Sequence, residues 1–165
     1  MRRRRTLGFG LALLVLGTRL SAQQPTLAAT TEWLNGQFPQ YLQYDLDGRS
    51  LTRAVYIKAT NCTLTVTDAS STSSTEQSNM TSHVALKDLD AGHMAIEALG
   101  SQRSDGVLLV VNTANGRLAV TSNVRGQELR GKTLLLAIAE LPLASRIQAA
   151  LAHAIRLCGG GTDPF

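Results

Sequence analysis

Apolar and polar residues alternate along much of this chain, which is the period of half-buried β-strands. The clearest case is 61–68, where Cys62, Leu64 and Val66 alternate with three threonines. The dense apolar run 106–112 predicts the most buried strand. Weaker patterns predict further strands at 51–59, 82–88, 93–98, 117–122 and 132–140, although the leucines and alanines of the last range also suit a helix.

Helical patterns lie at the two ends of this strand-rich region. Thr30 or Thr31 can cap a short helix that ends at Pro39. Apolar residues recur at helical spacing from Leu143 to Cys158, and a glycine follows the last turn. These elements predict an α+β fold, in which a curved antiparallel sheet of about six or seven strands carries both helices. A pleckstrin-homology-like arrangement has this order of elements and is the architecture that we expect.

Two connections between the predicted strands have distinct sequences. Residues 68–79 are almost all small and polar, and such a run buries too little apolar surface to offset its ordering entropy, so we expect a flexible loop. Asn115-Gly116 stands between two β-like runs and predicts a tight hairpin there.

The N-terminal segment has the layout of a secretory signal peptide. Consecutive arginines precede the apolar run 7–16, and Ala22 is the small residue at the cleavage position. We therefore expect a signal peptide at 1–22, a flexible leader at 23–29 and a single globular domain at 30–165. The mature protein is expected to be periplasmic or secreted, with no stable membrane anchor after signal cleavage.

Cleavage changes the charge of the chain. The full sequence has 16 Lys and Arg against 12 Asp and Glu, a net charge of +4. Five of the arginines precede residue 23 and no acidic residue does, so the mature chain has 11 basic and 12 acidic residues and a net charge of −1. The basic character therefore belongs to targeting, and we expect no nucleic-acid partner.

The chain has two cysteines, and both occupy apolar positions of predicted elements. In an exported protein, where thiols oxidise, a Cys62–Cys158 disulfide is the simplest use of the pair. Two buried free thiols are the alternative. A redox-active pair is disfavoured because the sequence has no Cys-x-x-Cys motif.

The C-terminal segment also carries a resemblance. Residues 146–165 read RIQAALAHAIRLCGGGTDPF, and residues 84–90 read VALKDLD. The first segment resembles the signature of an uncharacterised family of secreted bacterial proteins, in which an amphipathic helix ends in Leu-Cys-Gly-Gly and the chain ends in Pro-Phe; the second is similar to a weaker segment of that family. The resemblance implies a bacterial exported domain and no particular chemistry.

Catalytic signatures are scarce in this sequence. His83 and His93 could join Asp88 and Asp90 around a metal ion only if the intervening turn brought them together, and no His-Glu-x-x-His spacing occurs. His153 is more simply a solvated residue of the last helix, where it favours the negative end of the helix dipole. We therefore expect no catalytic, cofactor-binding or metal site.

These observations favour a non-catalytic binding or interaction module, with an unknown protein or a small apolar ligand as partner. The expected interaction cluster is aromatic and consists of Trp33, Phe38, Tyr41 and Tyr44. One alternative is a carrier that holds an apolar small molecule between the sheet and the C-terminal helix, which requires an enclosed apolar cavity. A hydrolase that uses His83 and His93 is the least favoured reading.

Overall fold

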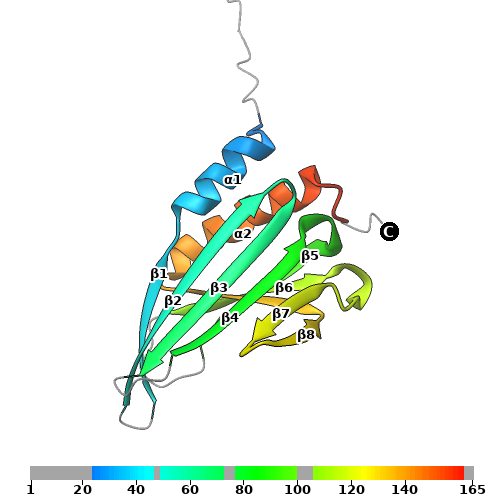
Figure 1. The fold of residues 1–165 in the computed structure, drawn as a ribbon. Helices are drawn as coiled ribbons and strands as arrows, with labels where there is room; N and C mark the ends of the chain where they lie inside the picture. The colour runs from blue at the N-terminus through cyan, green and yellow to red at the C-terminus, as the bar shows by residue number, and fades with distance from the viewer. Residues whose placement is uncertain (1–23, 47–48, 73–76, 100–105, 162–165) are drawn as a thin grey trace, which may run out of the picture.

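The strands of the protein form two antiparallel sheets. The computed structural model describes residues 24–46, 49–72, 77–99 and 106–161, and in this part the chain forms two α-helices and nine strands in an open α+β arrangement (Figure 1). The larger sheet has the order β1-β2-β3-β4-β7-β8 and the smaller one the order β5-β6-β9. The single sheet that the sequence predicted is therefore wrong, whereas the α+β class is confirmed. The pleckstrin-homology-like arrangement stays a prediction.

The larger sheet consists of β1 (Gln40–Leu46), β2 (Arg49–Thr60), β3 (Thr63–Thr72), β4 (Gln77–Ala85), β7 (Val120–Val124) and β8 (Gln127–Gly131). The smaller sheet consists of β5 (Leu89–Ala98), β6 (Val107–Thr113) and β9 (Thr133–Ile138). The helices are α1 (Leu27–Gly36) and α2 (Leu141–Leu157), and two 3-10 turns lie at η1 (Leu86–Asp88) and η2 (Ala114–Gly116). In Figure 1 the long strands of the larger sheet lie in front of α2 and of the smaller sheet.

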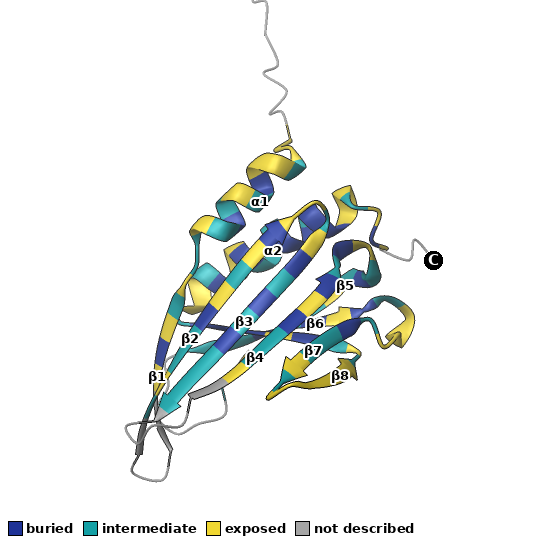
Figure 2. Cartoon of the chain, in the orientation of Figure 1, coloured by how far each residue is buried: buried dark blue, intermediate teal, exposed yellow. Residues whose placement is uncertain are grey.

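One apolar core joins both sheets and both helices. Alternate residues of β3, such as Leu64 and Val66, are buried, and the threonines between them are not, which Figure 2 shows as alternating colours along the strand. Fully buried side chains of the smaller sheet and of α2, including Leu109, Leu136 and Ile155, belong to the same core. The core is aliphatic, and its fully buried large side chains are leucine, isoleucine and valine.

Helix α2 confirms the predicted amphipathic helix and begins two residues earlier than expected. Its apolar stripe is buried, and Gln148 donates a hydrogen bond of 3.2 Å to the Met94 carbonyl of β5. After the helix, Gly159 has a φ of +77°, a left-handed conformation that glycine adopts without steric cost. A Cβ at Gly160 would lie 2.8 Å from the Leu86 carbonyl oxygen, so the two glycines close the helix and let it approach η1.

Two predicted loop features are wrong. The small polar run 68–79 is largely a hairpin, because β3 and β4 stay paired from Asp68↔Met80 to Ser71↔Gln77. The β-branched threonines fit a strand, and the backbone of β3 is paired on both sides, by β2 and by β4. Residues 73–76 of the predicted loop lie outside the described residues.

Asn115-Gly116 does form a tight turn, with φ values of +56° and +62°, but the strands beside it do not pair. The turn carries the chain from β6 in the smaller sheet to β7 in the larger one. Local turn chemistry was predicted correctly, whereas the pairing depended on contacts distant in sequence.

The N-terminal helix starts earlier than predicted. Thr26, and not Thr30 or Thr31, is its cap, and its hydroxyl accepts a hydrogen bond of 3.3 Å from the Ala29 amide. The last residues of the expected flexible leader 23–29 therefore form the first turn of α1. The segment 1–22, predicted as a signal peptide, lies outside the described residues.

Among the helices of the described residues, none combines the length and the apolar character that crossing a membrane requires.

Candidate functional site: an apolar groove between the two helices

An apolar groove of about 440 Å³ lies between α1 and α2. Its lining consists of Pro25, Ala29, Thr30, Trp33, Ala149, Ala150 and His153. Two alanines form most of the α2 wall and a third belongs to the α1 wall, and their short side chains leave the space between the helices open. The volume lies within the range of roughly 300–1,000 Å³ that is usual for small-ligand sites.

Both ends of the groove are defined by contacts between its two walls. At one end the His153 ring donates a hydrogen bond of 2.7 Å from Nε2 to the Pro25 carbonyl. Toward the other end, Arg146 is not itself a lining residue, but its guanidinium lies 5.3 Å from the centre of the ring of Trp33, which lines the groove, within cation–π range. Because early residues of α1 meet late residues of α2, the two helices run in opposite directions.

Polar and apolar contacts hold helix α1 in place, and its hydrogen bonds to the larger sheet come from one side chain. The Asn35 side chain donates to the Ala59 carbonyl at 3.1 Å and accepts from the Ala59 amide at 2.7 Å. Leu34, one residue earlier, is fully buried in the core. These contacts hold the wall that carries Trp33 in place.

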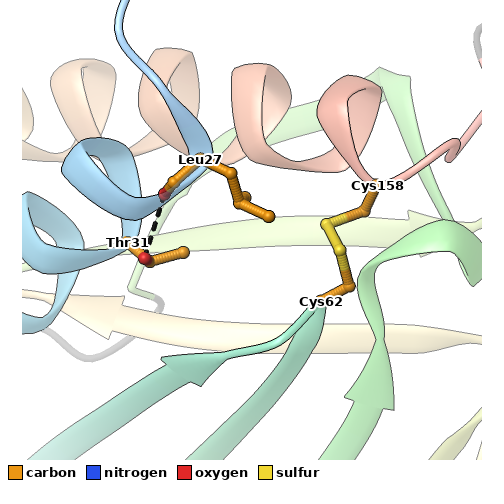
Figure 3. Close-up of a disulfide and its surroundings, with 4 residues drawn as sticks. All are labelled: Leu27, Thr31, Cys62 and Cys158. Carbon is orange, nitrogen blue, oxygen red and sulfur yellow. Dashed lines mark hydrogen bonds between the residues drawn. A yellow bond between two sulfur atoms is a disulfide. The ribbon is translucent and has the colours of Figure 1, made fainter.

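A disulfide holds the end of the other wall, as predicted. Cys62 and Cys158 are bonded, with their Cα atoms 5.6 Å apart. Figure 3 shows that the bond joins the β2–β3 turn to the end of α2, and that the Leu27 side chain of α1 extends toward it. Cys62 is not inside a strand as the alternation predicted; it occupies a two-residue turn with Asn61, at φ values of +60° and +47°.

The predicted aromatic cluster is divided between different parts of the fold. Trp33 and Phe38 are half-buried and pack against the core, and Trp33 also lines the groove. Tyr41 is 62% exposed on β1, and its hydrogen bond to Tyr56 raises the pKa of Tyr56 above its ordinary value. Tyr44 belongs to β1, and its side chain lies outside the described part of the structure.

Tyr41 lines a second and more polar hollow of about 280 Å³ over β1 to β4. The other lining residues are Thr52, Ala54, Ala69, Ser70, Ser71 and Asn79. The structure therefore places Tyr41 and Trp33 at separate hollows.

The histidines and acids singled out in the sequence form local pairs. His83 shares a hydrogen bond of 3.0 Å with Thr65 on the neighbouring strand, and His93 contacts Asp90 at 2.7 Å. Partial burial would raise the pKa of Asp90, but hydrogen bonds from the Gly92 amide and the His93 ring outweigh it and lower the pKa below its ordinary value. Within the described ranges, no three His, Cys, Asp or Glu residues are placed to share a metal ion.

Sequence reasoning missed one wall of the groove. His153 was expected to be simply solvated, whereas it is half-buried and bonds to Pro25. Ala149 and Ala150 carried only a weak signal, which is a pair of small residues beside the apolar stripe of an amphipathic helix. The partner wall could not be read from the helix itself.

Comparison of the sequence with protein-family models and with curated proteins, and of the structure with solved structures, gave no match.

Proposed function

We propose that this chain is a non-catalytic binding module of an exported bacterial protein, and that it binds an apolar group in the groove between α1 and α2. The observation that carries the proposal is the groove itself, an apolar hollow of about 440 Å³ walled by Trp33 and by alanines. An apolar ligand bound there would remove its own apolar surface and that of the groove from water. Such burial contributes a favourable free energy of about 25 cal/mol per Å² of apolar area.

The surroundings of the groove support a binding role. Asn35 anchors one wall on β2, and the Cys62–Cys158 bond anchors the end of the other. A preformed site loses less conformational entropy when it binds, which raises affinity for a given contact area. Export is supported by the signal-like N-terminus and by the disulfide, since disulfides persist in oxidising compartments such as the periplasm or the medium.

Two alternatives have less support in the geometry. A carrier with its ligand between the sheet and α2 would need space where Ile147, Leu151 and Ile155 are buried in the core. A hydrolase would need its histidines in one cleft, whereas His83 and His93 are both exposed, each in a local pair of its own.

A neutral apolar dye can test the groove. Trp33 is the only tryptophan of the chain, so energy transfer from it to N-phenyl-1-naphthylamine reports binding close to the groove. We expect saturable transfer for the mature wild-type chain. Ala149→Phe places a ring in the groove from an exposed position of α2 and should weaken binding about tenfold, as overpacking of about 1–3 kcal/mol implies.

Ala28→Phe is the matched control, because Ala28 is exposed on α1 and is not among the lining residues. It should bind the dye as wild type does. Equal binding by wild type and Ala149→Phe, with both folded by circular dichroism, would contradict the proposed site.

A further inference from the structure

We infer that the ligand of the groove is a free single-chain amphiphile with an anionic headgroup, such as a fatty-acid anion. This inference rests on the proposed function and names the class of ligand. It follows from the different character of the two ends of the groove, which the structure shows through two pairs of contacts.

The interior of the groove suits a hydrocarbon chain. Ala149 and Ala150 lie between Arg146 and His153 on α2, and these four residues have the i, i+3, i+4, i+7 spacing of one helix face. Seven residues of helix rise by about 10 Å at 1.5 Å per residue, so this wall offers an apolar length of that order. The His153–Pro25 hydrogen bond joins the two walls where this stretch ends.

A cation, Arg146, lies beside the opposite end, over the lining residue Trp33. The guanidinium of Arg146 lies over Trp33, and Arg146 is exposed. Helix α2 carries Arg146, Arg156 and His153 but no Asp or Glu, and the acid closest in sequence to Trp33 is Glu32 on α1. Among the ion pairs of the described residues, none involves Arg146.

These two ends distinguish the class of ligand. A wholly apolar molecule would leave the guanidinium without a charge to bind, and a cationic amphiphile would place like charges together. An anion can accept hydrogen bonds from the planar guanidinium while its chain lies along the alanines. We choose a free amphiphile over a protein segment because the His153–Pro25 bond joins the walls at one end, which fits a chain terminus better than a continuing backbone.

The test compares three ligands that share one ten-carbon chain and differ in charge. Decanoate, decanol and decyltrimethylammonium, each below its aggregation concentration and at neutral pH, compete with the bound dye in the mature chain. We expect decanoate to bind most tightly and decyltrimethylammonium most weakly. The preference for decanoate should fall as salt is raised, since screening weakens exposed charge pairs.

Variants of two arginines of α2 test whether Arg146 causes the preference for decanoate. Arg146→Gln should weaken decanoate binding about threefold and leave decanol binding unchanged, as expected for a partly exposed charge pair. Arg146→Lys should retain part of the preference. Arg156→Gln removes an exposed arginine of the same helix that lies beyond His153, at the opposite end of the groove from Trp33, and should change the binding of neither ligand.

Equal binding of the three ligands would overturn the inference while leaving the proposed groove intact. Loss of all three together with the dye would instead contradict the proposed function. The assignment would also be overturned if the protein bound phosphatidylglycerol vesicles and monomeric decanoate did not compete with this binding. That result would favour a membrane surface as the partner.

Discussion

Removal of the disulfide should lower the stability of the protein strongly. The bond joins residues 96 positions apart. In the chain-entropy model, closure of a loop of that size in the unfolded chain corresponds to about 4.7 kcal/mol at 25 °C. Domains of ordinary size have a free energy of unfolding of about 5–15 kcal/mol. The double variant Cys62→Ser/Cys158→Ser should therefore lack a large part of the wild-type free energy of unfolding.

The conformation of Cys62 refines this prediction. Cys62 has a φ of +60° in the β2–β3 turn, a left-handed conformation that disfavours residues with a Cβ by about 1–2 kcal/mol. Glycine adopts it freely but loses more backbone entropy on folding. Cys62→Gly/Cys158→Ser should therefore be more stable than the double serine variant, by about 1 kcal/mol or slightly less.

Urea unfolding followed by Trp33 fluorescence measures both differences, because Trp33 packs against the core and is the only tryptophan. The wild-type protein is compared with the two double variants, and each free energy is extrapolated to water. A loss below about 1 kcal/mol for the double serine variant would refute the entropic argument. A glycine variant less stable than the serine variant would refute the argument from the turn.

Three further outcomes follow from the structure. Gly160→Ala should destabilise by about 1–3 kcal/mol, because its Cβ meets the Leu86 carbonyl oxygen, and thermal unfolding measures the loss. In the wild-type protein the Nε of Arg53 lies 2.8 and 2.7 Å from the two carboxylate oxygens of the buried Asp68. Arg53→Met leaves that carboxylate buried without its guanidinium partner and should lower the free energy of unfolding by about 3 kcal/mol, as measured by urea unfolding. His93→Ala should raise the pKa of Asp90 in an NMR titration. Because folding lowers the pKa of Asp90, the ionised Asp90 stabilises the folded protein at pH values above its pKa in the unfolded chain. This stabilisation is lost as the pH falls through the pKa of Asp90 in the folded protein.

Elements with a strong local signal were predicted well. The periodicity of α2, its terminal glycines and the apolar run of β6 each depend on nearby residues, and each of these elements is present. The run is not the most buried strand as predicted, because β9 buries four of its six residues and β6 three of its seven. The Cys62–Cys158 pairing was also correct, although Cys62 lies in a turn and not in the strand that the alternation predicted. Because the chain has only two cysteines, the pairing required only that they lie close together.

The failures concern strand pairing. A turn such as Asn115-Gly116 specifies backbone dihedral angles but not the sheet that the next strand joins, and here β7 pairs with β4 instead of β6. The polar run 68–79 extends strands because β2 pairs with β3 over its full length and because Arg53 binds the buried Asp68. Both partners belong to the neighbouring strand β2, which a two-residue turn joins to β3, so the composition of the run concealed a local hairpin.

The groove depends on contacts between residues distant in sequence, and one of them links ligand binding to the disulfide. The end of the groove with the His153–Pro25 bond is the end near Leu27 and Cys158, where the disulfide fixes the last turn of α2. The Trp33–Arg146 end lies about 10 Å away along α2 and is held instead by Asn35 on β2. In the double serine variant, at urea concentrations that leave it folded, the hydrocarbon-binding end should therefore loosen first. Affinity for decanol and decanoate should fall by the same factor, and the preference of Arg146 for the anion should persist.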